Sequence, residues 1–133
     1  MAIKISLFYA GMLGLLLTAL SFNVMYHWVR VTGKGRESDL VMRRAERVLA
    51  SFVEYAPMTI ILLALIELRG APVFAVHLLG ALAVVARVLH AVGSNQIKGA
   101  GLMRFMGAQL TFLVVMVLSF ACIYLFIFGP TTI

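Results

Sequence analysis

The chain has 133 residues, the length of a single domain, and 63% of them are hydrophobic whereas 12% are charged. Soluble domains are about 45–50% apolar and about 25% charged, and a chain of this size has too little interior to hide so many apolar side chains. The composition therefore predicts an integral membrane protein. Cys122 is the single cysteine, which excludes a disulfide framework. The three histidines are scattered along the sequence, so no metal site is predicted.

The net charge of +6 is concentrated in one segment of the sequence. Six of the eleven Lys and Arg residues lie between Arg30 and Arg47. A basic segment indicates either nucleic acid or a membrane surface as its partner. No aromatic residue interleaves with these charges, as a surface that binds single-stranded nucleic acid requires. We therefore interpret them as charges flanking a membrane, and expect lipids but no nucleic acid as partners.

Four long apolar stretches follow one another along the chain. A bilayer core of about 30 Å requires about 20 helical residues, and backbone groups in lipid must be satisfied within the spanning segment. The sequence therefore predicts an all-α integral membrane protein, a bundle of four transmembrane helices that forms one domain over residues 1–133. The predicted helices are residues 5–29, 39–68, 71–92 and 105–128, with Ser38 or Asp39 as the N-cap of the second.

The Lys and Arg residues between the predicted helices set the expected orientation, since such residues stay on the cytoplasmic side of a membrane. The connections after the first and third helices are rich in them, whereas the opposite side carries only Lys4 and Arg69. We therefore expect both termini on the non-cytoplasmic side. The residues expected on the cytoplasmic side are Arg30, Lys34, Arg36, Arg43, Arg44, Arg47, Lys98 and Arg104.

Ionisable residues inside the apolar stretches mark the candidate site, because each is costly at a helix centre. Arg47, Ser51 and Glu54 are spaced i, i+4 and i+7 on the second helix, which places them in one stripe. Arg87 and His90 are three residues apart on the third helix and share a face. All five are expected at the cytoplasmic depth of the bundle.

Arg44 and Arg104 are expected at that depth too, so the cations outnumber the carboxylate and an anionic ligand is expected. Two alternatives stay open. Arginines at helix ends also serve as membrane anchors, which applies to Arg43, Arg44 and Arg104. Arg87 and Glu54 could instead form a structural pair between helices.

The stretches RRAERVLASFVEYAP (residues 43–57) and ARVLHAVG (residues 86–93) resemble the MAPEG family, the membrane-associated proteins of eicosanoid and glutathione metabolism. The match is closest to small bacterial members. The combination Arg-x6-Glu-x2-Pro with Arg-x2-His carries the resemblance, and a weaker match includes Arg104 in RFMGAQLT.

The resemblance implies a homotrimer in a bacterial inner membrane that binds glutathione between subunits near the cytoplasmic face. It implies a glutathione transferase or peroxidase that acts on lipophilic electrophiles, with Arg104 as the candidate beside the thiol and no catalytic residue otherwise assigned. The residues implied to bind glutathione are Arg44, Arg47, Ser51, Glu54, Arg87, His90 and Arg104.

Several positions depart from the family pattern. Leu49 and Ser51 stand where the family has His and Asn, and Val92 stands where a Tyr often follows the third-helix His. Phe105 and Ala108 occupy positions where catalytic members place Tyr or Ser. The alternative function is therefore a non-catalytic lipid-binding or scaffold trimer. A small multidrug transporter is a third hypothesis, which the lack of an acidic residue in the first predicted helix disfavours.

Overall fold

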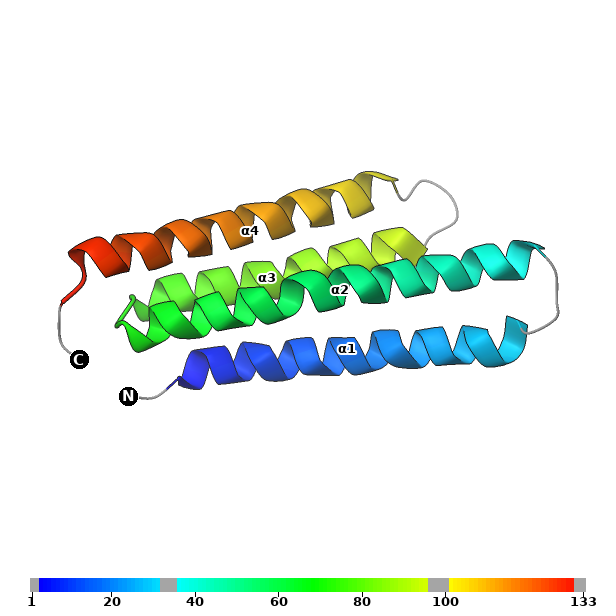
Figure 1. Ribbon diagram of the computed structural model, residues 1–133, viewed down its shortest axis with the longest axis horizontal. Helices are drawn as coiled ribbons and strands as arrows, with labels where there is room; N and C mark the ends of the chain where they lie inside the picture. The colour runs from blue at the N-terminus through cyan, green and yellow to red at the C-terminus, as the bar shows by residue number, and fades with distance from the viewer. Residues whose placement is uncertain (1–2, 32–35, 96–100, 131–133) are drawn as a thin grey trace.

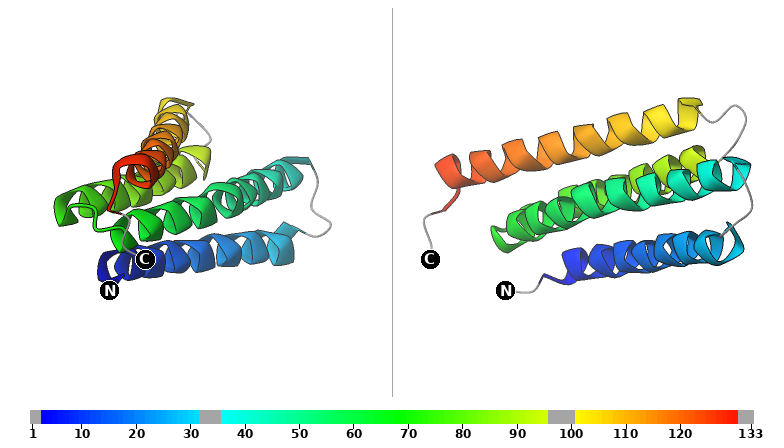
Figure 2. Two further views of the ribbon diagram at one scale, coloured as in Figure 1. Left: turned by 60° about the vertical axis from the view of Figure 1, so that its left-hand side comes forward. Right: turned by 45° about the vertical axis from the view of Figure 1, so that its right-hand side comes forward.

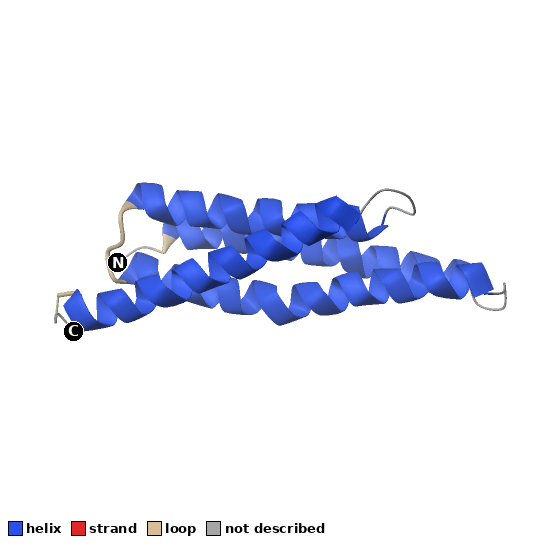
Figure 3. Cartoon of the chain, turned by 90° about the horizontal axis from the view of Figure 1, so that it is seen from above, coloured by secondary structure: helices blue, strands red, loops and turns tan. Residues whose placement is uncertain are grey.

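In the computed structural model, the chain forms four long helices (Figure 1). The structure describes residues 3–31, 36–95 and 101–130, so Lys34 and Lys98 lie outside the described residues. Within these ranges every regular element is a helix, as Figure 3 shows. The helices are α1 (Lys4–Val31), α2 (Arg36–Leu68), α3 (Val73–Asn95) and α4 (Gly101–Phe128).

All four helices are long and apolar enough to cross a membrane. The candidate membrane spans are Lys4–Arg30, Leu40–Leu68, Val73–Ser94 and Gly101–Phe128. The predicted all-α class and the four apolar helices are thus confirmed. The helices run alternately up and down, so α1 begins and α4 ends at the same end of the bundle (Figure 1).

The observed helices differ from the predicted ranges at their polar ends. The start of α2 at Arg36 shows that the N-cap prediction was wrong, because Ser38 and Asp39 lie inside the helix. The apolar pattern of the sequence predicts only the part of a helix that is suited to lipid. The helix itself continues beyond that part into the neighbouring polar segment. Pro72 precedes α3 and its carbonyl accepts a hydrogen bond from Val76 N at 3.1 Å, so α3 begins after this proline.

The α2 and α3 helices form the centre of the bundle, and α1 and α4 pack against them from opposite sides (Figures 1 and 2). A tight turn joins the two central helices. Gly70, at φ 81°, donates to the Glu67 carbonyl and Ala71 donates to the Ile66 carbonyl, both at 3.0 Å. These two bonds form a Schellman motif, which glycine permits because it lacks a Cβ.

We call the end of the bundle that carries the α2–α3 turn the turn end. There, the carboxylate of Glu67 accepts hydrogen bonds from the backbone N–H groups of Ile5 at 2.9 Å and Ser6 at 2.8 Å. These N–H groups belong to the first turn of α1, where an anion also interacts favourably with the helix dipole. Arg69 donates to the carbonyl of Leu125 in the last turn of α4 at 3.3 Å, and to that of Pro130 just beyond the helix at 3.0 Å.

The opposite end, which we call the arginine end, carries Arg43, Arg44 and Arg47 on α2 and Arg104 on α4. Here α3 and α4 approach closely through glycine. A Cβ on Gly107 would lie 2.5 Å from the backbone nitrogen of His90, and a Cβ on Gly93 would overlap the backbone of Arg104. This close packing sets His90 beside Gly107 and Arg104 beside Gly93, so both lie near the arginine end, three residues apart along the α3–α4 pair.

Candidate functional site

Arg87 is the buried cation of the arginine end. Its side chain is only 4% exposed and extends from α3 toward α2. One terminal nitrogen, Nη2, donates a hydrogen bond to the Ser51 hydroxyl at 3.3 Å. The guanidinium carbon lies 5.5 Å from the centre of the Phe52 ring, within the range of a cation–π interaction. Its Nε atom is buried and has no hydrogen-bond partner among the residues that the structure describes.

No carboxylate pairs with Arg87 among the residues that the structure describes. Glu54, the candidate partner on α2, is exposed on the outside of the single chain. Arg87 meets α2 at Ser51 and Phe52, and Glu54 points about 200° away from Phe52 around the helix, toward the exposed side. The structural pair between Arg87 and Glu54, one of the alternatives from the sequence, is not present within the chain.

His90 lies one turn beyond Arg87 on α3 and is half-buried against α4. Its Nδ1 atom is buried and has no partner among the described residues. Arg104 is exposed at the start of α4, next to the backbone of Gly93. The structure thus brings Arg87, His90 and Arg104 to one end of the α3–α4 pair.

The predicted stripe on α2 is divided by the fold. Ser51 is half-buried and contacts Arg87, whereas Arg44, Arg47 and Glu54 are exposed. Ser51 lies between Arg47 and Glu54 along the helix. Through Ser51, Arg87 therefore contacts α2 at the border between its buried face and its exposed, charged face. This arrangement presents several cations and the carboxylate of Glu54 to whatever covers that face.

A model of the MAPEG family matches residues 6–124 of the chain. The chain belongs to the MAPEG family. It is also similar to the inner membrane protein YecN of Escherichia coli strain K12, with 33% identity over 92 residues that cover 67% of this chain and 69% of that protein. The same protein from Escherichia coli O6:H1 strain CFT073 matches with the same identity and coverage. No solved structure matches the chain.

The family resemblance seen in the sequence is therefore confirmed, and the protein is a membrane protein of the MAPEG family with four candidate spans. The MAPEG motif on α2 and α3 maps onto the arginine end. Within it, the contacts of the described residues join Arg87 to Ser51 by a hydrogen bond and to Phe52 by a cation–π interaction. The other motif residues, Arg47, Glu54 and His90, keep polar groups available for a ligand or for another copy.

Sequence reasoning missed three residues around Arg87. Phe52 stacks on the guanidinium, and Thr59 and Thr111 line a pocket beside it. The sequence contained a helical spacing that could have identified them. Thr59 is seven residues after Phe52 on α2, which places both on one face of that helix. Thr111 is likewise seven residues after Arg104 on α4. Their significance depends on which faces meet, which the periodicity of a single helix does not reveal.

Proposed function

We propose that this MAPEG protein binds glutathione, or a similar anionic thiol peptide, at the arginine end of the bundle. The observation that carries the proposal is the buried Arg87, which reaches the α2 stripe at Ser51 without a carboxylate partner in the described chain. The residues proposed to bind the ligand are Arg44, Arg47, Ser51, Glu54, Arg87, His90 and Arg104.

The charges of the site complement those of glutathione. The ligand has two carboxylates and one ammonium group, which match a site with several arginines and one carboxylate. Arginine binds carboxylates in a planar, two-point geometry, and Glu54 supplies the counter-charge for the ammonium group. The open Nδ1 of His90 adds a polar group beside Arg87.

The exposure of Glu54 supports a homotrimer with the ligand between copies. A charged residue that faces lipid near a helix centre costs about 2.5–3.5 kcal/mol on insertion scales, and Glu54 lies within the span of α2. Coverage by a second copy removes that cost. The printed name of YecN supports an inner-membrane location, and the distribution of Lys and Arg favours both termini on the non-cytoplasmic side.

The proposed reaction is transfer of glutathione to, or reduction of, a lipophilic electrophile. A cationic site lowers the pKa of a bound thiol, which increases the thiolate fraction. Arg104 is the candidate for this role because it is exposed at the start of α4, near His90.

The second candidate is a non-catalytic lipid-binding or scaffold trimer. The Ser51–Arg87 hydrogen bond favours it, since that contact gives Arg87 a role in joining α2 to α3 without any ligand. Phe105 and Ala108, where catalytic relatives carry hydroxyl groups, also favour it.

Thermal unfolding of the purified protein in detergent tests the binding proposal. A ligand that binds only the folded state stabilises it by RT ln(1 + [L]/Kd), about 2.7 kcal/mol at 100 times Kd. Millimolar glutathione should raise the unfolding temperature of the wild type and of the control Glu46→Gln, which changes another exposed carboxylate of α2. The variant Glu54→Gln should lose the shift.

Absence of a shift in the wild type, or an equal shift in Glu54→Gln, would contradict the binding proposal. Turnover of a chlorodinitrobenzene-type electrophile then separates the two functions. Turnover that depends on Arg104 supports the enzyme, and binding without turnover supports the non-catalytic alternative.

A further inference from the structure

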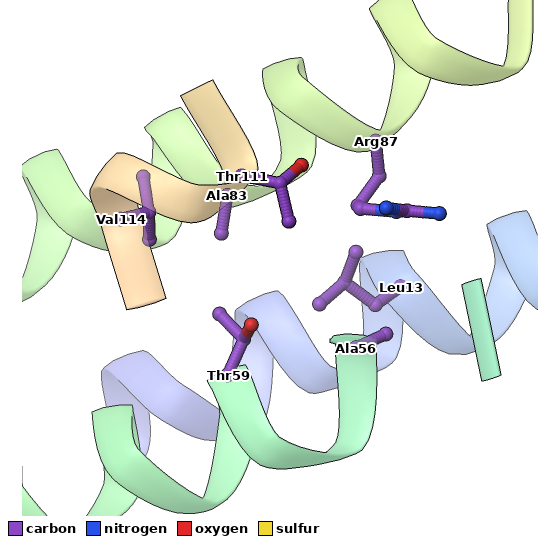
Figure 4. Close-up of a pocket in the computed structure, with 7 residues that line it drawn as sticks. All are labelled: Leu13, Ala56, Thr59, Ala83, Arg87, Thr111 and Val114. Carbon is purple, nitrogen blue, oxygen red and sulfur yellow. The ribbon is translucent and has the colours of Figure 1, made fainter. Parts of the chain in front are cut away.

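At the arginine end, α1 and α2 extend beyond the described ends of α3 and α4 (Figures 1 and 2). Deeper in the bundle, all four helices meet around a small pocket beside Arg87 (Figure 4). Toward the arginine end this packing stops, because no side chain of residues 21–30 on α1 and none of residues 40–44 on α2 is buried. We call residues 21–31 and 36–44 the α1–α2 extension. Its described side chains are available to the surroundings.

The lengths of the two helices place this extension outside the apolar core of a bilayer. α1 has 28 residues and α2 has 33, which correspond to about 42 and 50 Å of helix. The apolar core is about 30 Å thick and needs about 20 helical residues. Glu67 holds the start of α1 beside the end of α2, so the surplus, about a third of each helix, lies at the arginine end. The extension is thus at the depth of the lipid headgroups.

The extension carries a surplus of positive charge. Over residues 21–44, the sequence has five Lys or Arg residues and two Asp or Glu residues. Arg30, Arg43 and Arg44 are exposed, and no ion pair forms with any of them among the residues that the structure describes. Such a surface attracts anions, and anionic phospholipids supply negative charge at this depth of a membrane.

Aromatic side chains on the same extension favour a lipid headgroup over a free anion. Tyr26 and Trp28 are exposed, and these residue types are enriched at the headgroup level because their rings are apolar with one polar end. The guanidinium carbon of Arg30 lies 5.0 Å from the centre of the Tyr26 ring, within the range of a cation–π interaction. The ring therefore positions this cation at the level of the headgroups.

The turn end has no comparable surface within the described part of the chain. Glu67 is engaged in capping α1, and Arg69 donates to the carbonyls of Leu125 and Pro130. Lys4 is the exposed cation that remains there among the described residues. The charge available to a headgroup is therefore concentrated at one end of the bundle.

We propose that the α1–α2 extension binds the headgroups of anionic phospholipids, with Arg30 and Arg43 donating hydrogen bonds to phosphate oxygens. Arginine forms such charge-assisted bonds to phosphate at two points. Tyr26 and Trp28 lie beside the headgroup, where the acyl chains begin. Neither Arg30 nor Arg43 belongs to the proposed glutathione site, so this inference does not depend on glutathione binding.

Native mass spectrometry of the full chain in detergent tests the proposal by counting bound lipids. The probes are dioleoylphosphatidylglycerol, which is anionic, and dioleoylphosphatidylcholine, which is zwitterionic and has the same acyl chains. The wild type should bind the anionic lipid at least about fivefold more tightly, since one basic residue near an anionic surface contributes about this factor. The preference should weaken as the ionic strength rises, because salt screens exposed charges.

The double variant Arg30→Gln/Arg43→Gln should lower this preference by about fivefold or more. Its matched control, Arg30→Lys/Arg43→Lys, keeps both charges at the same positions and should retain the preference. Lys4→Gln removes an exposed cation from the turn end and should retain it as well.

Equal binding of the two lipids by the wild type would overturn the proposal, and this comparison requires no variant to fold. An unchanged preference in the folded double glutamine variant would overturn it too, because the headgroup would then lie elsewhere. Glycerophosphoglycerol, the same headgroup without acyl chains, should not displace the lipid at equal concentration; displacement would show that the surface binds a free anion. If the double variant does not fold, the single variants Arg30→Gln and Arg43→Gln provide the same comparison.

Discussion

Arg87 on α3 donates a hydrogen bond to the Ser51 hydroxyl on α2 at 3.3 Å, within the apolar part of the bundle. A guanidinium in such a place keeps its charge only where polar groups replace water. The Ser51 oxygen is the hydrogen-bond acceptor that the described chain provides for it. The contact therefore joins the two central helices and also positions the cation of the candidate site.

Ser51→Ala should destabilise the protein by about 1–3 kcal/mol, because it leaves a buried, charged donor without its acceptor. Unfolding in detergent measures the change. The matched control is Ser21→Ala, since Ser21 is exposed and donates only within its own helix, to the Leu17 carbonyl at 2.9 Å. The control should change stability by less than about 0.5 kcal/mol. Equal effects of the two substitutions would show that the Ser51–Arg87 bond does not stabilise the fold.

Glu67→Ala should loosen the start of α1. The carboxylate accepts from two N–H groups of the first turn, and loss of a helix cap costs about 0.5–2 kcal/mol. Hydrogen exchange at Ile5 and Ser6 should become faster, while exchange at the arginine end stays as in the wild type. Glu46→Ala, which changes an exposed carboxylate of the same helix, is the control. Unchanged exchange at Ile5 would mean that α1 does not depend on this cap.

Gly107→Ala should separate α3 from α4 at the arginine end. The new Cβ would lie 2.5 Å from the nitrogen and 2.8 Å from the Cα of His90, and neither backbone atom can move aside alone. The expected loss of stability is about 1–3 kcal/mol. Gly14→Ala is the control, because nothing lies within 4 Å of its Cβ and alanine favours an exposed helix by up to about 1 kcal/mol. Equal unfolding temperatures for both variants would contradict the close helix contact.

The four helices could be predicted from the sequence because lipid imposes a simple rule. Long apolar stretches must be helical there, and each predicted stretch overlaps an observed helix. The helix ends were less predictable. The start of α2 at Arg36 lies in a polar segment, where the apolar pattern gives no information. The role of Glu67 as a cap was missed as well, since it depends on which helix end packs beside α2.

The arrangement of the candidate site could not be predicted from the sequence, and the binding role of its residues stays a prediction. The spacing of Arg47, Ser51 and Glu54 predicts one stripe, and α2 is indeed a continuous helix through it. Which edge of that stripe faces α3 depends on packing: Ser51 turns inward to Arg87 and Glu54 faces outward. Helical periodicity identifies neighbours within one helix, whereas the contact between two helices depends on side-chain shapes along both.

The outward position of Glu54 leads to a prediction about assembly. On the single chain this carboxylate is exposed within the span of α2, next to Val53, which is 53% exposed. If a second copy covers this face, native mass spectrometry should detect three copies. Glu54→Arg should shift the protein toward single copies, because it reverses the charge near the middle of the apolar span of α2, where water does not screen it. Glu46→Arg makes the same change of charge nearer the start of α2, and should leave the assembly as it is. A wild type that stays a single copy, or a trimer that persists in Glu54→Arg, would mean that Glu54 does not lie between copies.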